Sequence, residues 1–385
     1  MHENNSFINT LDLINFVMKY SLLIGIIVSQ LTCYSQVARQ AVCFKGTSDS
    51  NVFDYPKEAL SNTAFDGDWR GIFYGETHTL YFEVGLKYQL ITHLNSQFGV
   101  RDVFMEIGYS AAFLYNQYLE TGDTALLINP RLPYSLPVSN HRILWKRLYE
   151  YNKTLPTNLK LRIHGVDFER TEACKALLLL KPVENDIPKE LQEVFSEVEE
   201  LASSKGLQWN SMGFRKKFES ICKALRSNDS ETRKLFGDNY PIVKSIIENS
   251  KFSGFTKVRD DRMFNGMERI IQDYKIEKFV GMFGGDHTTL ESSTALPTQF
   301  LKKAEYQGKI VTISSIYRNT HNPFTHTDIN FLGPTSNGLK ETTEIFEKYL
   351  TKECRAILIP TTKMDTPLNS IADYLLLVND SQPVK

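Results

Sequence analysis

Short runs of apolar and β-branched residues recur along the chain, and in its first half they alternate with amphipathic stretches. Runs of this kind are typical of strands buried inside a sheet. Strands are therefore predicted at 71–74, 103–105, 161–163, 279–283, 310–313, 356–359 and 374–378. The stretches 80–97 and 110–121 have the periodicity of helices that bury one face. Strand–helix–strand alternation predicts an α/β fold with a mostly parallel central sheet flanked by helices.

The stretch from 186 to 258 has a different pattern, because its apolar residues recur at helical spacing and none of its runs is typical of a strand. Asp186 is placed to cap a helix that has Pro188 in its first turn. Further helices are predicted at 210–226 and 230–249. We expect an all-helical insertion in the α/β domain, serving either as a lid over a cleft or as packing alone.

The N-terminus carries the pattern of a secretory signal peptide. Residues 22–28 form an apolar run that follows Lys19 and is too short for a bilayer, which needs about 20 apolar residues. Translation from Met18 would give a conventional basic start, and cleavage after Ser35 would leave Gln36 as the mature end. We expect a secreted or periplasmic protein with no transmembrane anchor after signal removal. Lipid attachment at Cys33 is the second option, although the residues before it make a poor lipobox.

The expected organisation follows from these patterns. It comprises a signal peptide at 1–35, an N-terminal extension at 36–64, the first half of the α/β domain at 65–185, the helical insertion at 186–258 and the second half of the α/β domain at 259–385.

Composition narrows the class of protein. The 385 residues carry 44 Lys and Arg against 45 Asp and Glu, so there is no basic excess to neutralise the phosphates of a nucleic acid. The five cysteines form no Cys-x-x-Cys pair, which argues against a thiolate zinc site or a redox motif. Four of them remain in the mature chain, and isolated buried thiols are a simpler interpretation than disulfides for Cys43, Cys174, Cys222 and Cys354.

Candidate chemistry follows the predicted strands, because ligands of a parallel sheet bind outside the carboxyl ends of its strands. The first strand is followed by Glu76 and His78, the second by Glu106, the third by His164 and Asp167, and the fourth by His287. Two of these segments share the form Gly-x-x-His, at 75–78 and 284–287. Four successive strand ends that supply carboxylates or histidines predict an active site at this edge.

The sequence resembles the erythromycin esterase-like superfamily, which also includes ChaN-like haem-uptake proteins and Tiki/TraB-type proteins. The resemblance spans about residues 65–380 and rests on the ordered set Tyr74-Gly75-Glu76-Thr77-His78, Gly99 to Glu106, Asn116-Gln117-Tyr118, Trp145-Lys146-Arg147, Tyr151-Asn152, Gly165-Val166-Asp167, Arg259-Asp260-Asp261-Arg262-Met263 and Gly284-Gly285-Asp286-His287. Only Thr77 separates Glu76 from His78, whereas erythromycin esterases usually have one more residue there. The resemblance therefore leaves the substrate open.

The resemblance and the residue types together predict a hydrolase in which histidine-activated water attacks an ester or amide carbonyl of a small-molecule or peptide substrate. His78 is the expected general base, since an imidazole can accept a proton near neutral pH. Glu76 or Glu106 would orient it. His287 would stabilise an oxyanion. Predicted substrate-binding residues are Arg259, Asp167 and Glu83.

Three alternatives stay open at this stage. A divalent metal ion such as zinc or manganese is one, held by His78, His287 and Glu106, because the Tiki-type branch is metal-dependent. Haem or iron binding without enzymatic activity, as in the ChaN-like branch, is another. A serine hydrolase with Ser110 as nucleophile is the third, although Ala112 stands where a nucleophile elbow has its second glycine.

Overall fold

A computed structural model of the chain describes residues 42–44, 65, 68–77, 81–127, 138–183, 186–203, 212–251, 258–322, 327–332, 344, 347–348, 350, 356–361 and 370–379. The predicted signal peptide at 1–35 and the predicted general base His78 lie outside the described residues. So do Cys33 and Cys354.

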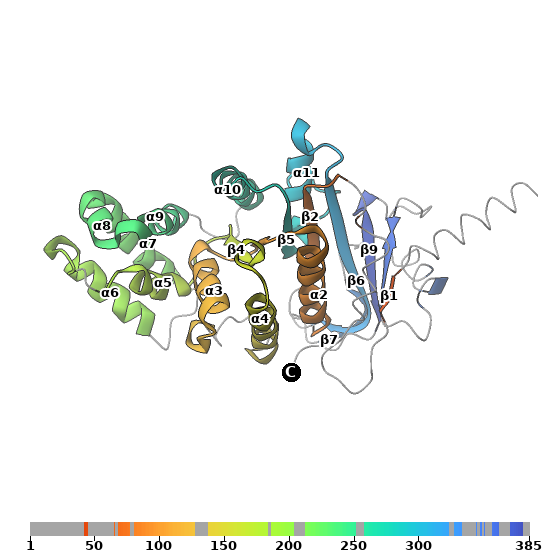
Figure 1. The fold of residues 1–385 in the computed structure, drawn as a ribbon, viewed down its shortest axis with the longest axis horizontal. Coiled ribbons are helices and arrows are strands. Elements are labelled where there is room, and N and C mark those ends of the chain that lie inside the picture. The colour runs from red at the N-terminus through yellow and green to blue at the C-terminus, as the bar shows by residue number, and fades with distance from the viewer. Residues whose placement is uncertain are drawn as a thin grey trace, which may run out of the picture.

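The described strands form one twisted central sheet, shown in Figure 1. Its strand order is β1-β8-β9-β6-β2-β5-β3-β4, with β7 paired to β6. Neighbouring strands from β9 to β4 are parallel, whereas β1–β8, β8–β9 and β6–β7 are antiparallel pairs. The strands are β1 (Val42–Phe44), β2 (Gly71–Glu76), β3 (Asp102–Met105), β4 (Arg162–Gly165), β5 (Phe279–Gly284), β6 (Ile310–Asn322), β7 (Thr327–Leu332), β8 (Ala356–Pro360) and β9 (Tyr374–Asn379).

Most of the parallel strands are separated in sequence by helices, because a parallel pair needs a crossover connection and a helix is the usual one. The described α-helices are α2 (Tyr81–Phe98), α3 (Tyr109–Thr121), α4 (Val138–Lys153), α5 (Glu172–Leu180), α6 (Gln192–Ser203), α7 (Met212–Ser227), α8 (Asp229–Phe236), α9 (Tyr240–Asn249), α10 (Arg259–Tyr274) and α11 (Leu296–Leu301). Together with the sheet they confirm the predicted α/β class.

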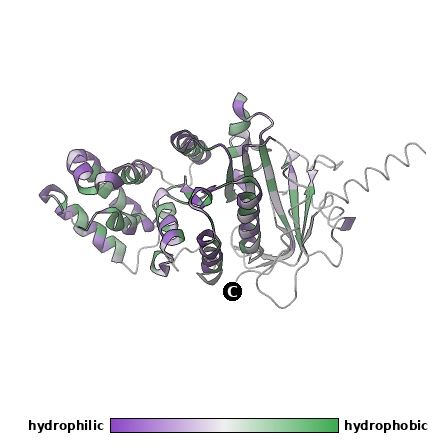
Figure 2. Cartoon of the chain, viewed as in Figure 1, coloured by the Kyte–Doolittle hydropathy of each residue, from purple (hydrophilic) through white to green (hydrophobic). Residues whose placement is uncertain are grey.

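The two faces of the sheet bury different sets of side chains, because alternate residues of a strand point to opposite faces. One face packs residues such as Ile72 and Val103 against α2, α3 and α4. The other face packs Phe73, Phe104 and Phe279 against α10 and α11. Most residues of the central strands β2, β3 and β5 are therefore apolar (Figure 2).

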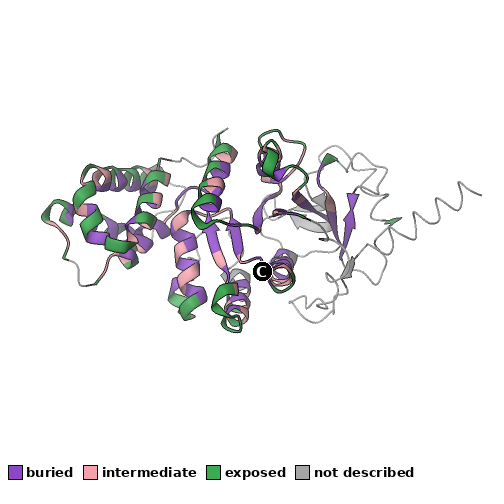
Figure 3. Cartoon of the chain, turned by 45° about the horizontal axis from the view of Figure 1, so that its top comes forward, coloured by how far each residue is buried: buried purple, intermediate pink, exposed green. Residues whose placement is uncertain are grey.

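The segment between β4 and α10 contains helices and no strand among its described residues, as predicted. Helices α6–α9 pack on one another and on α5 through a core that is continuous with one face of the sheet. They lie at one end of the elongated molecule, and their outward faces are exposed (Figure 3).

The sequence patterns missed several elements and placed some boundaries wrongly. The stretch predicted as one helix at 230–249 is two helices, α8 and α9, separated by Gly237, whose φ is 53°. Strands β1 and β7 and helices α4, α5 and α11 were not predicted. β4 also runs two residues further than expected, so His164 lies inside the strand, where its Nε2 is 2.7 Å from Asp102 Oδ1.

Two further features bear on the sequence predictions. Cys174 and Cys222 are free, buried thiols. Among the described residues, the helices are all too short or too polar to cross a membrane.

The ends of β3 and β4 approach each other unusually closely. The Asp167 amide donates to the Ile107 carbonyl over 2.9 Å, across the loops that follow the two strands. A side chain at Gly165 would have its Cβ only 2.6 Å from the carbonyl carbon of Gly108. Glycine at 165 is therefore a condition for bringing Glu106 and Asp167 to one place.

We expect Gly165→Ala to lower the free energy of unfolding by about 2–3 kcal/mol, because backbone rather than a flexible side chain must move. Chemical denaturation measures this. Gly285→Ala is the matched control, since its Cβ would meet its nearest neighbour at 3.8 Å. Equal stability of the two variants would contradict the close approach.

Candidate active site

Neighbouring parallel strands deliver the predicted site residues to one edge of the sheet. Glu76 is the last residue of β2, and Glu106 directly follows β3. Asp167 lies two residues after β4. His287 ends the short 3₁₀ helix η6 (Gly285–His287), which follows β5. Because β2, β5, β3 and β4 are adjacent in the sheet, these residues share its carboxyl edge.

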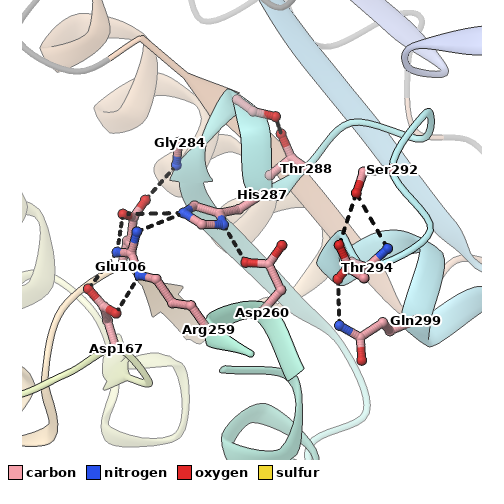
Figure 4. Close-up of polar contacts among 11 residues, drawn as sticks. Glu106, Asp167, Arg259, Asp260, Gly284, His287, Thr288, Ser292, Thr294 and Gln299 are labelled. Atoms are coloured by element: carbon pink, nitrogen blue, oxygen red, sulfur yellow. Dashed lines mark hydrogen bonds and ion pairs between the residues drawn. The ribbon is translucent and has the colours of Figure 1, made fainter. Parts of the chain in front are cut away.

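Arg259, the first residue of α10, is the centre of the network at this edge (Figure 4). Its Nε and Nη2 donate to the two oxygens of Asp167 over 3.0 and 2.8 Å, and Nη2 also donates to Glu106 over 2.6 Å. Asp167 is fully buried and accepts a further bond of 3.0 Å from Arg170. Burial lowers the pKa of Arg259, but Asp167 and Glu106 more than offset this and raise the pKa above its ordinary value.

His287 is held between Asp260 and Arg259. Its Nδ1 lies 2.5 Å from Asp260 Oδ1, and its Nε2 lies 3.0 Å from Nη1 of Arg259. A guanidinium can only donate, so Nε2 is the acceptor and the ring proton is on Nδ1. This is the geometry of a neutral imidazole.

Protonation of His287 would break its bond with Arg259. Burial lowers the pKa of His287, but the hydrogen bond with Asp260 and the charge of Glu106 outweigh it, so the pKa is raised overall. Nε2 also lies 3.6 Å from Glu106 Oε1, to which a protonated ring can turn. Because its pKa is raised, His287 would lose the contact with Arg259 by protonation at a higher pH than a free histidine would.

Glu106 joins two strands and the helix α10. Besides its bond with Arg259, it accepts the Gly284 amide of β5 over 2.8 Å. The carboxylate is thus held by a charged donor and a backbone donor, and these bonds fix its orientation at the edge.

Glu76 forms an ion pair with Lys87, a residue of α2 that the sequence analysis did not single out. The side chains of Glu76 and Lys87 are both 9% exposed. Burial lowers the pKa of Lys87 to about 8, against the opposing charge of Glu106. Lys87 therefore links Glu76 electrostatically to Glu106 and to the network at Arg259.

Glu83 lies apart from Arg259, in a second buried cluster. It is in the first turn of α2 and is 1% exposed. Its carboxylate accepts from the hydroxyls of Tyr74 and Tyr317 and from the Thr77 amide.

The comparisons with known proteins bear on the fold. The sequence matches no family model and no curated protein. Among solved structures, a protein of Bacillus cereus superposes with a TM-score of 0.57 at 15% identity, over 92% of this chain and 98% of that one. A succinoglycan biosynthesis protein gives 0.56 at 14% identity, over 92% and 98%. A histidine-to-asparagine mutant of erythromycin esterase EreC, in its open conformation, gives 0.54 at 16% identity, over 85% and 95%.

The chain has the fold of an erythromycin esterase. The resemblance predicted from sequence motifs is thus confirmed at the level of the fold. At such identities a shared fold does not carry over an activity.

Glu106 and His287 do not fit a metal ion in the described arrangement. Both aim acceptor atoms at the guanidinium of Arg259, which already supplies positive charge between them. Within the described part of the chain, no three His, Cys, Asp or Glu side chains are grouped to hold a metal. The third predicted ligand, His78, lies outside that part.

Ser110 does not reach the candidate site. It is fully buried in the first turn of α3, and its hydroxyl donates to Glu169. Glu169 also accepts the amides of Tyr109 and Ser110 over 2.9 and 3.2 Å, and so caps α3. Asn249, at the end of α9, donates to the same carboxylate over 2.9 Å.

Three site residues were missed or misread in the sequence. Asp260 looks like part of the exposed charge run 259–262, yet it faces His287, while Asp261 and Arg262 are exposed. Arg170 was missed because it belongs to none of the recognised sequence motifs. Lys87 has one usable signal, since it follows Glu83 by four residues and both interrupt the apolar stripe of α2.

We expect Arg259→Met to lower the free energy of unfolding by about 3–5 kcal/mol, because it leaves Asp167 buried with one partner fewer. In Arg259→Met/Asp167→Leu the two changes should be non-additive by about 1–3 kcal/mol. Chemical denaturation of Arg259→Met, Asp167→Leu and the double variant measures the coupling. The control is Arg269→Met, also on α10, whose side chain is 43% exposed. Full additivity would show that Arg259 and Asp167 do not depend on each other.

Glu169 generates a pH dependence of stability. Burial raises its pKa from 4.5 to about 7, so the folded protein binds more protons than the unfolded chain between these pH values. Stability due to Glu169 therefore falls as pH rises through this window. Relative to Glu169→Gln, wild type should lose about 3 kcal/mol between pH 4.5 and 7, measured by urea denaturation. A pH-independent difference would contradict this.

Proposed function

We propose that the protein is a hydrolase in which a histidine-activated water attacks an ester or amide carbonyl of a small-molecule or peptide substrate. The observation that carries the proposal is the network of Arg259 with Glu106, Asp167 and His287 at the carboxyl edge of the sheet. Similarity of fold to an erythromycin esterase supports it.

Arg259 suits the stabilisation of a developing oxyanion. Its charge is fixed by two carboxylates and the imidazole, so little reorganisation is needed when negative charge appears nearby. We assign His287 the supporting part, since its neutral ring, held by Asp260, receives a bond from Arg259 and so orients the guanidinium.

The proton from water goes to His78 in this proposal. Glu76, which closes β2 two residues before His78, and Glu106 supply the negative charge that stabilises the resulting imidazolium. When the bond to the leaving group then breaks, His78 returns the proton to the leaving alcohol or amine. Hydrolysis of the bond is then balanced, with the water oxygen retained in the acid product.

We expect His78→Ala to lower kcat/KM for ester hydrolysis by at least about 100-fold, because general-base catalysis is lost. The measurement is turnover of a panel of p-nitrophenyl and aliphatic esters by the purified mature protein. Melting should be unchanged.

The control is His93→Gln, which replaces a histidine of α2 that packs against Phe65 and Phe98 and lies outside the proposed machinery. It should retain the wild-type rate. Full activity of His78→Ala, or equal losses in both variants, would overturn the assignment of the base.

A further inference from the structure

A buried carboxylate holds the backbone on both sides of Glu76. The Thr77 amide, which follows Glu76, donates to Oε1 of Glu83 over 2.9 Å. The Gly75 carbonyl, which precedes Glu76, accepts from the Ser315 hydroxyl over 2.8 Å. Ser315 Oγ in turn lies 3.3 Å from the same Glu83 oxygen. The two peptide groups that flank Glu76 are therefore both hydrogen-bonded within one cluster around the Glu83 carboxylate.

The cluster joins three elements of the fold. Tyr74 of β2 donates to Oε2 of Glu83 over 2.6 Å, and Tyr317 of β6 donates to Oε1. Glu83 itself belongs to α2. All three side chains are buried to at least 98%. Any shift of α2 along the sheet would break these bonds together, so the position of Glu76 is tied to the packing of α2.

This carboxylate is costly to bury. Burial raises the pKa of Glu83, and the opposing influences come from neutral donors, namely the hydroxyls of Tyr317, Tyr74 and Ser315 and the Thr77 amide. An apolar side chain of similar size would avoid the desolvation. What the carboxylate adds to the fold is an acceptor for a specific backbone amide.

The same helix also holds the side chain of Glu76. Lys87 follows Glu83 by four residues, so both lie on one face of α2. Lys87 binds the Glu76 carboxylate, while Glu83 binds the peptide group next to it. Together they leave Glu76 little freedom of backbone or side chain.

We propose that Glu83 is a positioning residue, which orients Glu76 in the active site through the Thr77 amide and does not contact substrate. This rests on the proposed hydrolase function.

The test compares Glu83→Gln with Glu83→Met. Glutamine keeps an acceptor for the Thr77 amide, and Tyr74 can reverse its hydroxyl to accept from the new amide group. Methionine has similar length but no comparable acceptor. Amide exchange at Thr77, followed by NMR, reports the hydrogen bond directly. Steady-state kinetics on the ester that is hydrolysed best report how loss of this hydrogen bond affects catalysis. Thermal melting confirms that each variant folds.

In Glu83→Met we expect exchange at Thr77 to accelerate by about tenfold or more. We also expect kcat to fall by about 100-fold with KM nearly unchanged, because Glu76 is displaced from its working position. Glu83→Gln should stay close to wild type in both measurements. This rescue by the conservative variant separates an acceptor role from a need for charge.

Two results would overturn the inference. One is normal protection of Thr77 in Glu83→Met, and the other is lost protection with an unchanged kcat. A rise in KM in Glu83→Gln with normal exchange would instead assign Glu83 to substrate binding and would also overturn it. An inactive wild type would refute the hydrolase proposal, and amide exchange would then decide separately whether Glu83 holds the backbone at Thr77.

Discussion

The arrangement of side chains at the carboxyl edge of the sheet follows from one constraint, which is that buried charges must be paired. Asp167 is fully buried, the Glu106 side chain is 11% exposed, and both carboxylates are paired with Arg259. Arg259 is 92 residues from Asp167 and 153 from Glu106 in the sequence. The helical insertion must therefore bring the chain back so that α10 begins at the ends of β3, β4 and β5. The network at Arg259 is therefore complete only when the chain returns from the insertion to this edge of the sheet.

The insertion is joined to the site by more than the chain itself. Asn249, at the end of α9, donates to the Asp167 carbonyl over 2.5 Å as well as to Glu169. Arg226 of α7 binds the Ile247 carbonyl near the same end over 2.8 Å. The last turn of α9 is thus fixed both to the other inserted helices and to the peptide that carries Asp167. The peptide that carries Asp167, a direct partner of Arg259, is therefore in contact with the insertion.

Strands and helices could be predicted from the sequence because they follow repeating patterns of apolar residues. Contacts between residues far apart in the sequence could not. The seven predicted strands exist because apolar runs have few alternatives to a sheet interior. Strand β7 was not predicted because its sequence, Thr327–Leu332, mixes polar and apolar residues and contains no continuous apolar run; it pairs antiparallel with β6. Asp260 looked like part of a solvated charge run, since only the fold shows which side of α10 faces the strand ends. Lys87 was missed because a lysine four residues after a glutamate usually lies on an exposed face.

The two polar clusters have complementary effects on the same site. The network at Arg259 fixes a positive charge by surrounding it with carboxylates, and the cluster at Glu83 fixes a negative one, Glu76, by its backbone. Lys87 lies between them, paired with Glu76 and influenced by Glu106. A hydrolytic site needs both a basic region to accept a proton and a cationic region to receive an oxyanion. In the proposed hydrolase, β2 and α2 would hold Glu76, and β3, β4 and α10 would hold the network at Arg259.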